Sequence, residues 1–333
     1  MTENLEIFIL TYNRCKFLKQ SLLSVLNQTI PVKVTVVDNA SDDETQGFVN
    51  KMREKYSNLN YIRQEKNVGW LGNIKTAIAN THADYVMYFH DDDILHPQYV
   101  EFVKKTLDSF DNVDLICSNM TTFTDEKSID IKNLKEVDVN IFKKRGDFGA
   151  YVLSSLFLGN IPLYFPSVVY RTQNLKKVDM DFLFQQYGKI ADKPMVISSI
   201  VDGCCVLGKN PALLNYRIHE GQDSSTSSNG PFPDQIINHN KLFYDISGHS
   251  FLADISSASW LKYLWEWGNN KQNISFYKLA LMAKRENACN VMTLLFANPI
   301  SRPFMKILQK FLTRNYNKKG KLLNYEENTI ILD

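Results

Sequence analysis

The stretch Tyr85-Val-Met-Tyr-Phe-His-Asp-Asp-Asp93 runs from five consecutive apolar side chains, through one histidine, into three carboxylates. A run that is apolar on both faces is typical of a strand buried in a parallel sheet. In open α/β sheets, ligands bind just beyond the carboxyl ends of the strands. We therefore expect Asp91, Asp92 and Asp93 to face a ligand. Adjacent like charges disfavour one another's ionised form unless a cation lies among them, and hard oxygen ligands suit Mg²⁺ or Mn²⁺.

The pattern on both sides of this stretch predicts the architecture. Apolar or β-branched runs predict strands at 7–10, 32–37, 61–63, 85–89 and 114–118, and amphipathic helical patterns separate them. Strands that alternate with helices over short connections indicate an α/β fold, with a mostly parallel sheet flanked by helices. No glycine-rich dinucleotide fingerprint or P-loop follows the first strand. Contacts to phosphate, if the ligand carries any, should then come from a metal and from side chains.

Composition narrows the class of protein. The 333 residues carry a net charge of +2, which gives no overall footprint for nucleic acid. The five cysteines form no C-x-x-C pair, and this favours reduced thiols in a cytoplasmic compartment. No stretch approaches the roughly 20 apolar residues that span a bilayer. We expect a cytoplasmic protein that does not bind nucleic acid.

The last hundred residues differ from the rest. A segment rich in Ser, Gly and Pro, residues 220–234, predicts a boundary between a domain at 1–225 and a helical C-terminal extension at 235–333. Between Glu286 and Glu326 there is no acidic residue but seven basic ones, and apolar residues fall on one helical face there. This basic tail has two open interpretations. It packs on the body of the protein or on a second subunit, or it lies on an anionic membrane surface at the inner membrane face.

Polar residues follow several of the predicted strands. Asp38 ends the second strand, and Asp91 to Asp93 follow the fourth, so these side chains should meet at one edge of the sheet. An acidic edge can hold a divalent cation, which would orient a diphosphate and neutralise the negative charge on a departing phosphate. A further carboxylate, such as Asp192, can accept a proton from an attacking hydroxyl.

Five segments, in this order and at these spacings, resemble glycosyltransferase family 2 with its GT-A, Rossmann-like fold. They are Ile9-Leu-Thr-Tyr-Asn-Arg14, Leu26-Asn-Gln28, Val36-Val-Asp-Asn-Ala-Ser41, Asn67-Val-Gly69 and Phe89-His-Asp-Asp-Asp93. The resemblance covers residues 5–120 well and 185–225 more loosely. It implies inverting transfer of a sugar from a nucleotide donor, commonly UDP-linked, with Mn²⁺ or Mg²⁺. The acceptor would be a hydroxyl of a saccharide or glycoconjugate, lipid-linked ones included, in bacterial surface polysaccharide or glycoprotein synthesis.

The resemblance also implies roles for particular residues. Tyr12 would stack on the base, Asp38 would accept a hydrogen bond from a base N–H, and Asp91 would face the ribose and the water shell of the metal. The full set of candidate nucleotide-sugar contacts is Thr11, Tyr12, Arg14, Asp38, Asn67, Asp91, Asp92 and Arg217.

On the catalytic side, Asp93 would be the direct metal ligand, and Asp91 and His219 would complete the metal site. Arg217 and His219 belong to a segment that resembles the one closing over the diphosphate. Asp192 would be the general base, although the usual Glu-Asp pair is Ala191-Asp192 here.

Several of these residues also have an ordinary structural interpretation. Asp91 to Asp93 can form a solvated acidic loop before a helix. Asp38 can form an Asx-turn with Asn39, Tyr12 can be a packing residue, Asp192 can cap a helix before Lys193-Pro194, and His219 can be a loop histidine. Two rival functions stay open as well. One is a non-catalytic sugar-nucleotide-binding partner subunit. The other is a sugar-1-phosphate nucleotidylyltransferase, which would need a glycine- and arginine-rich loop that Thr11-Tyr-Asn-Arg14 lacks.

Overall fold

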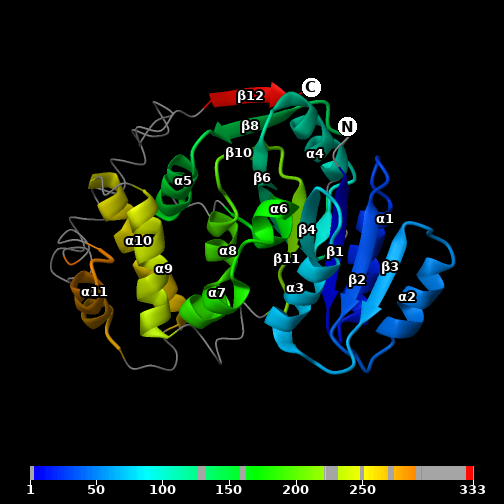
Figure 1. The fold of residues 1–333 in the computed structure, drawn as a ribbon, viewed down its shortest axis with the longest axis horizontal. Coiled ribbons are helices and arrows are strands. Elements are labelled where there is room, and N and C mark those ends of the chain that lie inside the picture. The colour runs from blue at the N-terminus through cyan, green and yellow to red at the C-terminus, as the bar shows by residue number, and fades with distance from the viewer. Residues whose placement is uncertain are drawn as a thin grey trace.

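The computed structural model describes residues 4–125, 129, 133–157, 163–220, 222, 232–247, 251–268, 274–289, 294 and 328–332. Figure 1 shows a large sheet through the middle of the molecule with helices on both of its faces. The basic tail lies outside the described residues.

The central sheet has nine strands in the order β12-β8-β10-β6-β9-β4-β1-β2-β3. Their bounds are β1 Leu5–Thr11, β2 Lys33–Asp38, β3 Leu59–Arg63, β4 Tyr85–His90, β6 Val113–Ser118, β8 Val137–Phe142, β9 Val169–Arg171, β10 Cys204–Asn210 and β12 Asn328–Leu332. The strands β8 and β9 run antiparallel to their neighbours, so the other seven share one direction. The predicted mostly parallel sheet is confirmed, and so are its five predicted strands.

Two apolar clusters cover the two faces of this sheet. Side chains alternate along a strand, so Ile7 and Ile9 of β1 face one cluster while Phe8 and Leu10 face the other. The first cluster packs against α1 (Cys15–Leu26), α2 (Thr45–Arg53) and α4 (Tyr99–Ser109). Burial on both faces is what the uninterrupted apolar runs of the strands require.

The other face carries the remaining helices. They are α3 (Gly69–Asn80), α5 (Arg145–Phe157), α6 (Thr172–Leu175), α7 (Met180–Tyr187), α8 (Asp192–Ser198), α9 (Pro233–Ile246), α10 (Phe251–Gly268) and α11 (Phe276–Arg285), with short 3-10 turns η2 (Phe165–Ser167) and η3 (Gly188–Ile190). The helix α10 packs on α5 and α9, and α11 packs on α9 and α10. The helices α5, α9, α10 and α11 lie on the side of the molecule away from β3 (Figure 1).

A second, three-stranded sheet lies beside the carboxyl end of β4. It consists of β5 (Ile94–Leu95), β11 (Leu214–Arg217) and β7 (Met120–Phe123), with β11 in the middle. Since β5 starts directly after Asp93, the acidic turn is held between the large sheet and the small one. The small sheet therefore brings residues near 217 next to residues near 92.

The C-terminal region departs from the sequence prediction in one respect. Residues 328–332 form the strand β12, which pairs antiparallel with β8 at the edge of the large sheet, where we expected a helix. The division into domains at 1–225 and 235–333 stays a prediction. Within the described segments, no helix combines the length and apolar character needed to cross a membrane.

Candidate functional site

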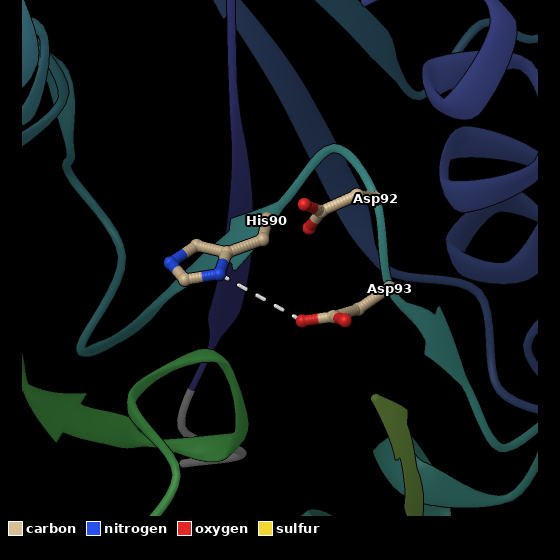
Figure 2. Close-up of side chains that lie close together, drawn as sticks. All are labelled: His90, Asp92 and Asp93. Carbon is tan, nitrogen blue, oxygen red and sulfur yellow. Dashed lines mark ion pairs between the residues drawn. The ribbon is translucent and has the colours of Figure 1, made fainter. Parts of the chain in front are cut away.

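The ends of three neighbouring parallel strands form the site. Thr11 ends β1, Asp38 ends β2 and lies opposite Thr11 in the pairing, and His90 ends β4. The turn from β4 into β5 then carries the three aspartates, all of them buried. Figure 2 shows the imidazole of His90 and the carboxylates of Asp92 and Asp93 around this turn.

Asp91 is held by the loop after β1. The Thr11 hydroxyl donates a hydrogen bond to Asp91 Oδ2 at 2.7 Å. Arg14 Nη1 lies 3.6 Å from Asp91 Oδ1 and 3.3 Å from Asp92 Oδ2. Burial, and next the charge of Asp92, still raise the pKa of Asp91 to about 7 against the opposing effect of Arg14. The site is therefore short of positive charge.

Asp93 has one anchored and one unanchored oxygen. The Arg217 backbone N–H donates to Asp93 Oδ1 at 3.0 Å. Asp93 Oδ2 is buried without a hydrogen-bond partner among the described residues and lies 3.7 Å from His90 Nδ1. Burial, followed by the charge of Asp92, raises the pKa of Asp93 well above its ordinary value. A buried carboxylate oxygen without a donor is costly, and a cation among these groups would remove that cost.

A ligand set for such a cation is present. His90, Asp92 and Asp93 each offer one ligand atom, and these atoms lie within 4.8 Å of one another. Carboxylate oxygen and imidazole nitrogen are ordinary ligands of divalent cations. The residues of the site therefore fit a divalent metal ion.

Arg217 lies inside the protein instead of facing the ligand side. Its Nε donates to the Asp92 backbone carbonyl at 2.7 Å, and its Nη2 donates to Gln20 Oε1 at 2.6 Å. Its guanidinium lies between two rings, with centroids at 4.5 Å for Phe123 and 5.1 Å for Phe17. In this structure Arg217 holds the acidic turn in place through the Asp92 backbone carbonyl. Its predicted contact with a diphosphate remains a prediction.

His219 joins the cluster through Asp92. Its Nε2 lies 3.0 Å from Asp92 Oδ2, and its Nδ1 lies 2.8 Å from the Glu220 carbonyl. The ring also packs on Phe17, with centroids 4.5 Å apart. The histidine beside the unanchored oxygen of Asp93 is His90. The metal contact of His219 remains a prediction.

Asp38 is fully buried at the base of the neighbouring loop. Its Oδ1 accepts from the Ser41 backbone N–H at 2.8 Å, and its Oδ2 accepts from the Tyr61 hydroxyl at 2.5 Å. Arg63 Nε lies 3.6 Å from the same Oδ2. Burial, and next the hydrogen bond to Asp38, raise the pKa of Tyr61. Asp38 thus holds its turn through Ser41, three residues on, and not through the expected Asx-turn. Its contact with a base remains a prediction.

Two further predicted contacts flank Asp38. The side chain of Tyr12 is 44% exposed, so its ring is open to a ligand. Asn67 is an exposed loop residue whose Oδ1 accepts hydrogen bonds from Asn39 Nδ2 and from the Gly69 N–H. Asn67 therefore shapes the loop after β3 and joins it to the loop after β2.

Asp192 is the first residue of α8, and the N-cap of that helix is Ala191. The cap interpretation of Asp192 is therefore wrong. Its side chain is 30% exposed, and its Oδ2 lies 3.4 Å from Lys193 Nζ. A partly exposed carboxylate can serve as a proton acceptor, and the role of general base remains a prediction.

Sequence reasoning missed His90, Gln20 and Tyr61. His90 stands directly before the aspartates, so its position at the strand end was a usable signal. Gln20 and Tyr61 carry no local signal, because their roles arise from contacts with residues far along the chain, Arg217 and Asp38.

Comparison with known proteins agrees with this architecture. The sequence profile of "Glycosyl transferase family 2" matches residues 6–170, about half of the chain. The chain belongs to glycosyl transferase family 2. The matched range contains β1 to β4 and the acidic turn, so the resemblance drawn from the sequence is confirmed.

Curated relatives of this family 2 chain carry glycosyltransferase names. Abequosyltransferase RfbV of Salmonella typhimurium is 26% identical over 181 residues, which is 51% of this chain and 54% of RfbV. Poly(ribitol-phosphate) beta-N-acetylglucosaminyltransferase TarS of Staphylococcus aureus is 28% identical over 191 residues, 53% of this chain and 29% of TarS. The chain thus spans little more than half the length of the first relative and less of the second.

Solved structures extend the likeness to the whole chain. The crystal structure of S. aureus TarS 1–349 in complex with UDP-GlcNAc has a TM-score of 0.62 at 16% identity, and covers 98% of this chain and 96% of that one. At this identity the likeness concerns the fold. The predicted GT-A fold class is confirmed.

Proposed function

We propose that this family 2 protein is a metal-dependent, inverting glycosyltransferase that moves a sugar from a nucleotide donor to a hydroxyl acceptor. The observation that carries the proposal is the acidic turn after β4, where Asp93 Oδ2 is buried without a hydrogen-bond donor among the residues described. A cluster of carboxylates at the carboxyl end of a parallel strand is suited to hold a metal ion that in turn binds a diphosphate.

The donor is proposed to be a UDP-sugar. The loop after β2 is hydrogen-bonded to the loops after β1 and β3, and the exposed ring of Tyr12 offers a surface on which a base can stack. The fold-level neighbour TarS was crystallised with UDP-GlcNAc. The acceptor is proposed to be a surface polysaccharide or glycoconjugate hydroxyl. In support, RfbV is named as an abequosyltransferase and TarS as a poly(ribitol-phosphate) beta-N-acetylglucosaminyltransferase.

The roles of the residues follow from their positions. Asp93, with Asp91 and Asp92 beside it, would hold the metal ion, which supplies charge stabilisation for the departing diphosphate. Arg217 keeps the turn in place through the Asp92 carbonyl. Thr11 and Arg14 orient the carboxylates of Asp91 and Asp92. Asp192 would take the proton from the attacking hydroxyl, which leads to inversion when attack and departure occur on opposite faces of the sugar.

A panel of sugar nucleotides tests this proposal even while the acceptor is unknown. Each donor is incubated with the protein and Mn²⁺, and slow hydrolysis is followed by release of the nucleoside diphosphate. We expect turnover of one UDP-sugar by the wild type and none by Asp93→Ala. Asp181→Ala is the matched control, because Asp181 is an exposed aspartate that pairs with Lys75 on α3. Full activity of Asp93→Ala would refute the metal site. Nucleotide binding without turnover on any donor, with or without candidate acceptors, would favour the partner-subunit alternative.

A further inference from the structure

His90 immediately precedes the three aspartates of the acidic turn. It is the last residue of β4, and its side chain is 33% exposed. The Ser21 hydroxyl donates to the His90 carbonyl at 2.8 Å, and the ring lies 5.7 Å from that of Phe165. The backbone and ring of His90 are thus positioned by α1 and by η2.

The imidazole faces the unanchored oxygen of Asp93. Figure 2 shows the His90 ring and the carboxylates of Asp92 and Asp93 directed into one space from a single tight turn. His90 Nδ1 lies 3.7 Å from Asp93 Oδ2. Two ligands that each lie about 2.1 Å from one octahedral ion are about 3.0 Å apart when adjacent and about 4.2 Å apart when opposite. The measured separation falls between these values, so one ion can contact both atoms after small side-chain adjustments.

His219 is placed differently. Both of its ring nitrogens face protein oxygens, those of Asp92 at 3.0 Å and of the Glu220 carbonyl at 2.8 Å. The oxygen of Asp93 that lacks a hydrogen-bond donor in the described segments instead faces His90. His219 thus orients a carboxylate of the site, whereas His90 offers a nitrogen to it.

We infer that His90 is a direct nitrogen ligand of the bound cation, together with Asp92 and Asp93, and that it makes the site select Mn²⁺ over Mg²⁺. Both ions bind carboxylate oxygen, but Mg²⁺ demands near-ideal octahedral geometry and gives up its waters reluctantly. Mn²⁺, a first-row transition metal, accepts an imidazole nitrogen beside carboxylates more readily. This inference rests on the proposed function, because it assumes that a divalent ion binds at the acidic turn.

Metal binding to the full chain tests the inference without any measurement of turnover. Mn²⁺ binding is followed by electron paramagnetic resonance, first with the metal alone and then with UDP present, and Mg²⁺ binding by competition. Loss of even an outer-shell partner typically weakens metal binding by about 10- to 100-fold. We therefore expect His90→Ala to weaken Mn²⁺ binding by at least about tenfold, with a much smaller change for Mg²⁺. His82→Ala is the control, since His82 is exposed and precedes the other end of β4.

Two spectroscopic and chemical readouts separate a ligand from a structural residue. Pulsed resonance of bound Mn²⁺ should show coupling to a nitrogen nucleus that is lost in His90→Ala and kept in His219→Ala. His90→Asp converts the ligand set to oxygen alone, so its preference should shift towards Mg²⁺. A nitrogen signal that survives in His90→Ala, or an unchanged Mn²⁺ to Mg²⁺ ratio in both variants, overturns the inference.

The outcomes distinguish this inference from the proposed function. If Mn²⁺ binding is lost in Asp93→Ala but equal to wild type in His90→Ala, the metal site stands and His90 is not its ligand. If the wild type binds no Mn²⁺ even with UDP, the inference is wrong and so is metal dependence. Sugar transfer measured without metal would then still support a glycosyltransferase.

Discussion

Acidification should unfold this protein partly through one buried histidine, His239 on α9. Its ring stacks on those of Phe243 and Trp260, with centroids 4.9 Å and 5.4 Å away. Trp260 Nε1–H donates to His239 Nδ1 at 2.9 Å, and His239 Nε2 has no hydrogen-bond partner in the described part of the chain. A proton on Nδ1 would face the indole N–H, so the native state holds the neutral imidazole. Burial, and then the charge of Lys193, lower the pKa of His239 to about 3.

The sign and size of the effect follow from linkage. The unfolded chain takes up the proton near pH 6.5, whereas the native state does not until about pH 3. The stabilisation is therefore complete above pH 6.5 and is lost as the pH falls from 6.5 towards 3. Each pH unit well inside this window costs about 1.4 kcal/mol. Because the histidine of the unfolded chain is already half protonated at pH 6.5, the free energy of unfolding should drop by about 2 kcal/mol between pH 6.5 and 4.5.

Urea unfolding at several pH values, followed by circular dichroism, measures this slope. His239→Asn retains an acceptor for the Trp260 N–H but cannot be protonated, so its free energy of unfolding should lack this part of the pH dependence. The exposed His82, changed to Asn, should leave the wild-type slope intact. Equal slopes in wild type and His239→Asn would mean that His239 does not carry the acid sensitivity, and the argument from burial would fail.

Three further predictions concern the site and the sheet edge. Arg217→Met should lower the free energy of unfolding by about 3 kcal/mol in urea titrations, because two charge-assisted hydrogen bonds of a buried guanidinium are lost; a change below about 0.5 kcal/mol would contradict its placement. Leu332→Ala should cost about 2 kcal/mol in the same assay, and Ile331→Ala much less, because Leu332 joins the core whereas Ile331 is 54% exposed; equal costs would argue against the pairing of β12 with β8. Asp192→Asn should lower kcat for transfer by about 10²-fold or more while calorimetric binding of UDP stays unchanged; full transfer would place the base elsewhere.

The sequence was sufficient to predict the elements whose burial is intrinsic to their composition. The strand Tyr85–His90 is apolar on both faces. In a chain of alternating strands and helices, such a run indicates a strand buried in a parallel sheet. The strand β9, Val169–Arg171, has only three residues and inserts antiparallel between β4 and β6. Its existence depends on the gap between two longer strands, which no local pattern reveals. The same holds for β12, which is specified by pairing with β8, about two hundred residues earlier in the chain.

The site, too, could be predicted from the sequence only in part. Carboxylates after a buried strand could be recognised from their position, so Asp91, Asp92 and Asp93 were expected together. The direction in which a long side chain points could not be predicted from the sequence. Arg217 was expected to reach a ligand, but two aromatic rings and Gln20 hold its guanidinium inside the protein. Those contacts join β11 to α1, and they exist only after the small sheet has formed.

Charge balance explains why such a turn is better understood as a binding site than as a stabilising feature of the fold. Three buried carboxylates meet two permanently charged guanidinium groups, those of Arg14 and Arg217. Neither cation prevents the pKa of Asp91 from rising to about 7 or that of Asp93 from rising well above its ordinary value. Burying a charge without full compensation is expensive, and apolar residues at a strand end would avoid the cost. A divalent ion would supply the missing charge at the point where Asp93 and His90 face each other, and ligand binding would then resolve the shortage.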